Sequence, residues 1–234
     1  MNHFSEIRPP SGHPRRGHGG PTSLALAAAL ASGLALGDVR PCHAGTVVRG
    51  RVQMPSRTEA RNADGARVRE TLDARDAVVY VTVAPGEDAR KLGGRAGRNQ
   101  VDLRGDRFTP RVTPVMVNSR VRFRNRDRVY HNVFSVSPSG RFDLGNLAPG
   151  GRRETRIENP GVINLFCELH PAAAGFLVAC PNWFFARARA SGEYHLPALP
   201  RGRYVVHAWH PRFGETRRSV QVTGRDAVTL DLSL

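Results

Sequence analysis

Short runs of alternating apolar and polar residues cover most of the chain after residue 45. In Ser119–Asn125, Val121 and Phe123 fall on one face of an extended segment and three arginines fall on the other. This alternation is typical of a half-buried β-strand, and no stretch has the period of about 3.6 residues that marks an amphipathic helix. Further strands are predicted over Thr46–Met54, Ala77–Ala84, His131–Val136, Thr155–Ile157, Gly161–Phe166, Phe176–Ala179, Trp183–Ala188, Gly192–Leu196, Arg203–Trp209, Ser219–Val222 and Ala227–Leu232. Many short strands separated by turns predict an all-β protein built from sandwiches or barrels.

Composition agrees with a folded, turn-rich chain. The 234 residues are 40% hydrophobic and 24% charged, which excludes a wholly disordered protein and leaves room for one large or two small domains. The formal charge is +15, and Lys91 is the only lysine among 35 basic residues. This bias has two interpretations: a solvated arginine-rich surface that reflects composition alone, or a field that steers an acidic partner toward the protein.

The first 44 residues have the layout of an export signal. Arg15 and Arg16 precede the apolar run Leu24–Leu36, and Ala44 ends a plausible cleavage site. The run is too short for a comfortable transmembrane span. We therefore expect a periplasmic protein without a membrane span after cleavage, with a charge of about +13, and we do not expect nucleic acid as a partner.

Two cysteines, Cys167 and Cys180, remain after cleavage. In an oxidising compartment a disulfide is the simplest role for such a pair. If Cys167 and Phe176 flank a hairpin turn, however, Cys180 lies well over ~10 Å along the return strand. A disulfide needs Cα atoms within ~7 Å, so we predict that these two cysteines are not bonded to each other.

The end of the chain carries a motif of its own. Gly192-Glu-Tyr194 is followed by Leu199-Pro-Arg-Gly-Arg-Tyr204. This segment resembles the carboxypeptidase-regulatory-like, prealbumin-type sandwich, whose opening strands have counterparts near residue 45. The resemblance implies a discontinuous sandwich made of residues 45–85 and 181–234, with a linker at 86–97 and a second domain inserted at 98–180.

The inserted segment contains His131-Asn-Val-Phe-Ser135 and Phe166-Cys-Glu-Leu-His-Pro171. They are preceded by Phe108-Thr-Pro110 and the stretch Val115–Asp127. Together these pieces resemble the cupredoxins, the plastocyanin-like blue-copper domains. They are also similar to bacterial periplasmic proteins labelled methylamine utilization proteins, which share the downstream motifs Pro181–Ala186 and Trp209–Pro211. The resemblance implies a Greek-key β-sandwich that binds one copper ion.

A blue-copper site needs one thiolate and two imidazoles. Cys167 and His170 can meet across a Cys-x-x-His turn, and His131 at the start of a neighbouring strand can supply the third ligand. By the resemblance these three residues are the metal ligands. Asn132 would brace the cysteine-bearing loop, and Pro171 would lie beside the ligands in the same supporting shell.

The family's axial methionine is missing. Its position is occupied by Ala173, an alternative spacing falls on Gly175, and the only methionines are Met1, Met54 and Met116. Two outcomes remain open. Either three ligands bind copper, which favours Cu(I) and raises the reduction potential, or the site has decayed and the sandwich is kept for interaction.

Three functions follow from these features. The first is a one-electron carrier that docks a redox protein of the periplasm, either acidic or uncharged at its contact surface, on the apolar rim Pro171–Phe176. The second is a copper reservoir or chaperone, and the third is a metal-free module that binds a protein or a carbohydrate. We do not expect an enzyme, because no paired carboxylates or Ser-His-Asp arrangement is supported by the spacing.

Overall fold

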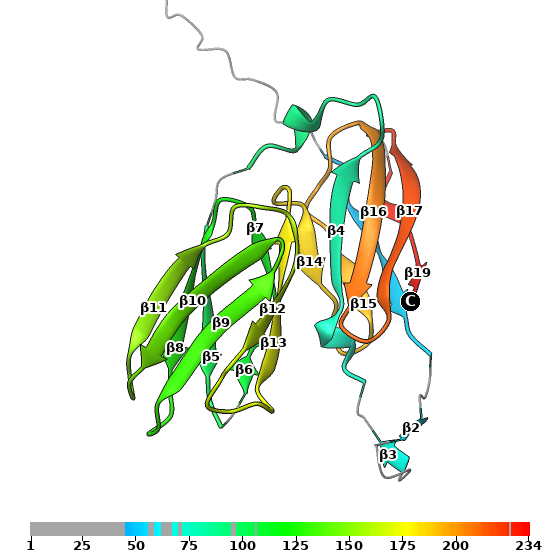
Figure 1. Ribbon diagram of the computed structural model, residues 1–234. Coiled ribbons are helices and arrows are strands. Elements are labelled where there is room, and N and C mark those ends of the chain that lie inside the picture. The colour runs from blue at the N-terminus through cyan, green and yellow to red at the C-terminus, as the bar shows by residue number, and fades with distance from the viewer. Residues whose placement is uncertain are drawn as a thin grey trace, which may run out of the picture. The chain divides into compact units, whose positions relative to one another are not determined.

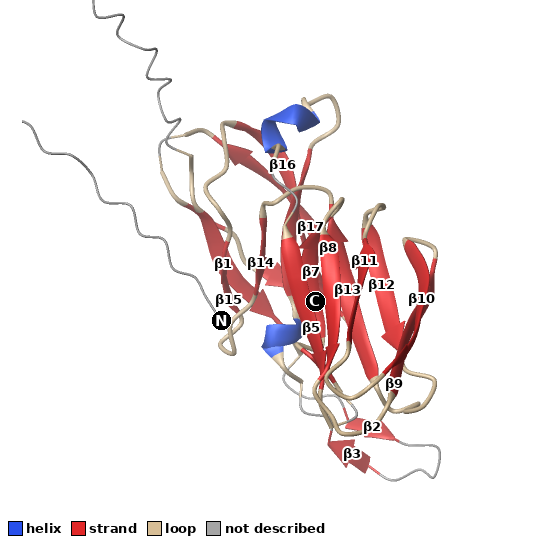
Figure 2. Ribbon diagram, turned by 90° about the vertical axis from the view of Figure 1, so that its left-hand side faces the viewer, coloured by secondary structure: helices blue, strands red, loops and turns tan. Residues whose placement is uncertain are grey.

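The computed structural model describes residues 45–55, 59–61, 67–69, 72–94, 97–105, 107–224 and 226–234. The predicted export signal at 1–44 lies outside these residues. The regular structure is strand apart from two single-turn 3₁₀ helices, η1 (Ala74–Asp76) and η2 (Ala89–Leu92) (Figure 2). The protein is therefore all-β, as predicted. Within the described part of the chain, none of the helices has the length and hydrophobicity needed to cross a bilayer.

The segment that carries the predicted ligands forms two sheets. One has the strand order β10-β9-β12-β13-β7 and the other β11-β8-β5-β6. Their strands are β5 (Arg98–Leu103), β6 (Phe108–Thr109), β7 (Val112–Met116), β8 (Arg120–Asn125), β9 (His131–Ser137), β10 (Gly140–Leu147), β11 (Arg152–Arg156), β12 (Gly161–Phe166) and β13 (Ala174–Cys180). Both sheets contribute to one hydrophobic cluster, with Phe123 from β8 and Leu165 from β12 among its buried members. Alternation in β8 is confirmed, since Val121 and Phe123 are fully buried and Arg120 is exposed.

A second pair of sheets uses residues from both ends of the described chain. Figure 1 shows β4, β16 and β17 side by side, as the strand order β14-β4-β16-β17 requires. The strands of this pair are β1 (Val48–Gln53), β4 (Val78–Val83), β14 (Phe185–Arg187), β15 (Glu193–His195), β16 (Gly202–His210), β17 (Gly214–Val222), β18 (Val228–Thr229) and β19 (Leu232–Ser233). Separately, β2 (Glu59–Arg61) and β3 (Arg67–Arg69) pair as a small antiparallel hairpin. Val48, Val79 and Val206 share a second hydrophobic cluster, separate from the first.

The domain boundaries stay a prediction. The predicted linker, however, contains a residue that packs into a hydrophobic cluster. Leu92, inside the predicted linker at 86–97, is only 4% exposed and belongs to the second cluster. A single apolar residue at the end of a 3₁₀ turn produces no periodicity in the sequence, so this contact left no signal.

Six strands were missed: β2, β3, β5, β6, β7 and β10. β7 contains Pro114, which argues against a central strand because proline lacks a backbone N–H. The structure resolves this conflict because β7 is the edge strand of its sheet. In β10 the pairing with β9 shifts between Asp143 and Asn146, which breaks the simple alternation.

Candidate metal centre

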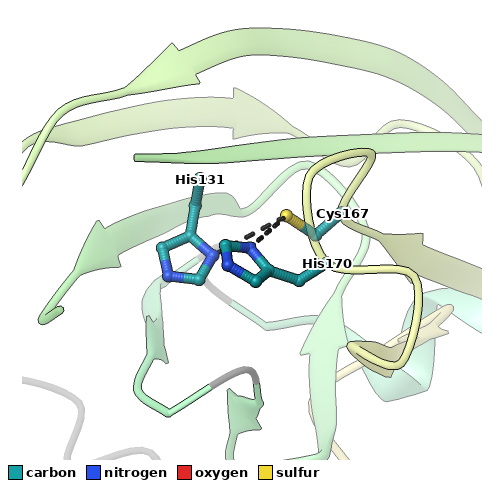
Figure 3. A group of neighbouring side chains, drawn as sticks. All are labelled: His131, Cys167 and His170. Carbon is teal, nitrogen blue, oxygen red and sulfur yellow. Dashed lines mark hydrogen bonds between the residues drawn. The ribbon is translucent and has the colours of Figure 1, made fainter. Parts of the chain in front are cut away.

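The register of two neighbouring strands brings the predicted ligands together. β9 and β12 are antiparallel, and Phe166 at the end of β12 pairs with Phe134. The start of β9, His131, therefore lies at the same end of the sheet as Cys167, the residue after β12. His170 follows in the turn that leads to β13. Nδ1 of His131 lies 3.6 Å and Nδ1 of His170 lies 3.5 Å from Sγ of Cys167 (Figure 3).

The turn between β12 and β13 is closed by its own backbone. The N–H of His170 donates to the carbonyl of Cys167 at 3.3 Å, and the N–H of Ala173 donates to the carbonyl of His170 at 2.8 Å. Pro171 is exposed in this turn. Ala173 is 1% exposed and belongs to the same hydrophobic cluster as Cys167. Its methyl group has no donor atom, so Ala173 cannot act as a ligand to a metal ion.

A carboxylate that we did not predict holds the buried histidine. Oδ2 of Asp127 lies 2.8 Å from Nε2 of His131, whose side chain is 0% exposed. A carboxylate only accepts, so Nε2 carries the hydrogen and the lone pair of Nδ1 is directed at Cys167. Both oxygens of Asp127 also accept from the N–H of Gly105 at 2.9 Å.

Asn125 fixes the loop that carries Asp127. Its Oδ1 accepts from the N–H of Asp127 at 2.9 Å, and its Nδ2 donates to the carbonyls of Val129 (2.7 Å) and Leu147 (2.9 Å). In the sequence, Asp127 is only an acidic residue four positions before His131. In a loop this spacing does not predict that the two side chains meet. The contact that supports His131 therefore depends on the path of this loop in space, which the sequence does not show.

Asn132 has a different contact from the one expected. Its Nδ2 donates to Oδ1 of Asp143 on β10 at 3.1 Å. Its Oδ1 is buried and has no hydrogen-bond partner among the described residues. The predicted contact with the Cys167 turn is thus not seen in this part of the chain. The reason is the register shift in β10, which brings Asp143 toward Asn132.

The three donor atoms fit a small soft metal ion. They all lie within 4.8 Å of one another, and two of the three residues are buried. An ion ~2.1 Å from nitrogen and ~2.3 Å from sulfur in a trigonal plane sets each N···S separation near ~3.8 Å. The observed separations of 3.5 and 3.6 Å are close to this value. One thiolate and two imidazoles are also the donor set that copper prefers in trigonal protein sites.

Exposed apolar side chains flank the ligands along the chain. Val129 and Tyr130 precede His131 and are 50% and 57% exposed, and Leu169 precedes His170 and is 49% exposed. Within the predicted rim Pro171–Phe176, Pro171 is exposed, but Phe176 packs against Trp209 with ring centroids 5.5 Å apart. Ala172 and Ala174 of the predicted rim are also exposed. We call Val129, Tyr130, Leu169 and Pro171, the larger exposed apolar residues next to the ligands in sequence, the apolar rim.

Cys180 is not part of the site. Both Cys167 and Cys180 are free thiols, which confirms the prediction that they are not bonded to each other. Cys180 is 0% exposed in a third cluster with Val78, Val112, Val178 and Trp209. Burial raises the pKa of its thiol well above the usual value, so it remains a neutral packing residue.

Comparison with known proteins gives a partial likeness. No family model matches the sequence. No curated protein matches it either. A purple cupredoxin from Nitrosopumilus maritimus is 26% identical, covering 35% of this chain and 98% of its own, with a TM-score of 0.32. A copper-containing nitrite reductase from Thermus scotoductus SA-01 is 25% identical over 42% of this chain and 24% of its own (TM-score 0.33). A reduced amicyanin variant is 20% identical over 43% of this chain and 98% of its own (TM-score 0.33). Since all three TM-scores lie below 0.5, what this chain binds is inferred from its own residues.

Proposed function

We propose that this protein is an exported one-electron carrier that holds one copper ion with His131, Cys167 and His170. The observation that carries the proposal is the convergence of two Nδ1 atoms on one sulfur, at 3.6 Å for His131 and 3.5 Å for His170, with His131 and Cys167 buried in the β-sandwich. The bound ion would supply reversible one-electron chemistry between Cu(I) and Cu(II). The remaining roles belong to the protein.

The protein keeps the ligands in place and limits water. His131 is 0% and Cys167 2% exposed, and a dry, rigid pocket reduces the reorganisation that accompanies a change of charge. Asp127 holds the His131 ring in one tautomer and orientation, which is the usual task of a carboxylate behind a metal-binding histidine. His170 is half-buried, so its outer edge is the route by which an electron reaches the ligands from a docked partner.

The apolar rim of Val129, Tyr130, Leu169 and Pro171 supports a docking role. Contacts between redox proteins are small and short-lived, and an uncharged rim beside the half-buried ligand suits such a contact. With Ala173 in place of a thioether donor, three ligands remain, which favours Cu(I) and a raised potential. We place this carrier in the periplasm, with a redox protein as its partner and no catalytic role of its own.

The test is a Cu(II) titration of the mature chain, residues 45–234, followed by visible absorption and EPR spectroscopy. We expect one equivalent of Cu(II), an intense band from thiolate-to-copper charge transfer and a narrow hyperfine splitting. Cys167→Ser should abolish the band, and the matched Cys180→Ser variant should keep it.

Other spectra would change the functional conclusion. Stoichiometric binding with a pale colour and a broad splitting would contradict the carrier and favour a copper reservoir or chaperone. No binding at one equivalent would contradict every copper function and leave a metal-free interaction or carbohydrate-binding module.

A further inference from the structure

Arginines gather on one outer sheet surface, which we call the arginine face. In β8, Val121 and Phe123 point into the core, so the alternate residues of β8 point outward. Strand pairing aligns them with outward residues of β5 and β11 on either side. The six arginines of this face are Arg98, Arg120, Arg122, Arg124, Arg152 and Arg156.

The pairing register places like charges directly opposite each other. Arg120 is the pairing partner of both Arg98 and Arg156, and Arg124 is the partner of Arg152. Like charges directly opposite on one sheet face destabilise the pairing. The face therefore holds an arrangement that strand stability by itself would not favour.

Two carboxylates neutralise only part of this charge. Glu154 pairs with Arg122 at 2.6 Å and reaches Arg120 at 4.0 Å, while Asp102 pairs with Arg126 at 3.0 Å. The neighbouring guanidinium groups, Arg122 first, hold the pKa of Glu154 below its usual value.

Four arginines of the face lack an ion pair. Among the described residues, no carboxylate pairs with Arg98, Arg124, Arg152 or Arg156, and Arg156 donates instead to Oδ1 of Asn118 at 3.2 Å. Elsewhere on the surface several arginines do have one, as in Arg51–Glu193 and Arg203–Glu87. What sets this face apart is the strand register, which places Arg98, Arg152 and Arg156 opposite other arginines.

We propose that the arginine face binds an acidic segment of a partner protein through that segment's carboxylates. A shallow cavity of about 120 Å³ on this face, lined by Arg98, Arg120, Arg122 and Glu154, has room for a carboxylate group. Three strands and five residues along each span roughly 10 by 14 Å, so the face is wide enough for more than one carboxylate. Guanidinium groups hold carboxylates by paired hydrogen bonds. The proposal goes beyond the copper function, because none of these residues is a metal ligand.

A protein fits this face better than a lipid bilayer does. The exposed large apolar residues of the described chain lie outside β5, β8 and β11, so the face lacks side chains that would insert into a membrane. Glu154 and Asp102 also lie on it. They would be repelled by an anionic bilayer, whereas mixed charges set register and specificity in a protein interface.

The experiment measures binding of a fluorescent peptide of about ten glutamates by anisotropy, in about 20 mM and about 150 mM salt. The test variant combines Arg98→Gln, Arg124→Gln and Arg152→Gln. None of these arginines pairs with a carboxylate in the described part of the chain, so the variant breaks no ion pair there. The matched control combines Arg189→Gln, Arg217→Gln and Arg218→Gln, three exposed arginines outside the face, and removes the same charge.

We expect the face variant to weaken peptide binding about tenfold and the control less than about twofold. Glu154→Gln frees Arg122 and should tighten binding about twofold to threefold. Equal loss in both triple variants, no binding by the unmodified protein at low salt, or binding to phosphatidylglycerol vesicles without binding to the peptide would each overturn the proposal. Cys167→Ser should bind the peptide as the unmodified chain does. Peptide binding is therefore tested independently of copper binding, even if the copper function fails. If the face variant does not fold, Glu154→Gln alone decides: unchanged or weaker binding would overturn the proposal.

Discussion

Replacing Asp127 with asparagine tests how the buried histidine is supported. The carboxylate accepts from Nε2 of His131 at 2.8 Å and from the N–H of Gly105 at 2.9 Å. Asparagine has the same shape but no charge, and only one of its two terminal atoms accepts. Either the amide oxygen replaces Oδ2 and keeps both contacts as neutral hydrogen bonds, or the amide nitrogen faces Nε2 of His131 and favours the other tautomer of that ring.

The size of the effect follows from the kind of bond that is lost. A hydrogen bond to a charged group contributes about 1.5–3 kcal/mol and a neutral one about 0.5–1.5 kcal/mol, so the change costs about 1–2 kcal/mol. Loss of such an outer partner typically lowers metal affinity by about 10–100-fold. The negative charge favours Cu(II) over Cu(I). If Cu(II) carries the whole difference, the potential of Asp127→Asn rises by about 40–90 mV, because about 59 mV is a tenfold change for one electron.

Three measurements examine this expectation. Competition with a chelator gives the Cu(II) affinity, and a redox titration gives the potential. Side-chain nitrogen NMR of the metal-free protein gives the tautomer of His131, which should be single in the unmodified chain and mixed in the variant. Asp102→Asn is the matched control, since Asp102 pairs with Arg126 at 3.0 Å in the same sandwich and does not contact the ligands. A folded Asp127→Asn protein with unchanged affinity, potential and tautomer would refute the reasoning.

Three further predictions concern Ala173, Cys180 and Glu215. Ala173→Met should lower the potential by adding a thioether donor, whereas Ala173→Leu, similar in size, should not; equal potentials by voltammetry would argue against an axial role for this position. Iodoacetamide should leave Cys180 unmodified in the native protein at pH 8, because burial raises the pKa of its thiol; peptide mass spectrometry that finds rapid labelling would contradict this packing. The hydrogen bond from His207 lowers the pKa of Glu215 below 4.5, so Glu215 stabilises the fold above about pH 4.5 and loses this effect as pH falls through the lower folded value. Glu215→Gln should therefore cost about 0.5–1 kcal/mol in urea unfolding at pH 7 and much less at pH 3, and an equal cost at both values would count against this role of the hydrogen bond.

The convergence of the ligands was readable from the sequence because it depends on strand order and a short turn. Cys167 and His170 are three residues apart, and His131 begins a strand whose neighbour ends just before Cys167. Alternating patterns mark such strands well when one face is buried. The support of His131 by Asp127 was not readable, since it depends on the path of an irregular loop. The hydrogen-bond partner of Asn132 depends on a register shift that the sequence of β10 does not predict.

The metal turn is also supported from the far side of its sheet. β13 follows the turn directly, and its residues Leu177 and Ala179 lie in the same core as Cys167. Phe176, Val178 and Cys180 point the other way, into the third cluster with Val78 of β4 and Trp209 of β16. Since β13 is packed on both faces, the strand that anchors the turn cannot shift without disturbing two clusters. A turn anchored in this way would change the separation of Cys167 and His170 little, which suits the proposed one-electron carrier better than a reservoir that must release its metal.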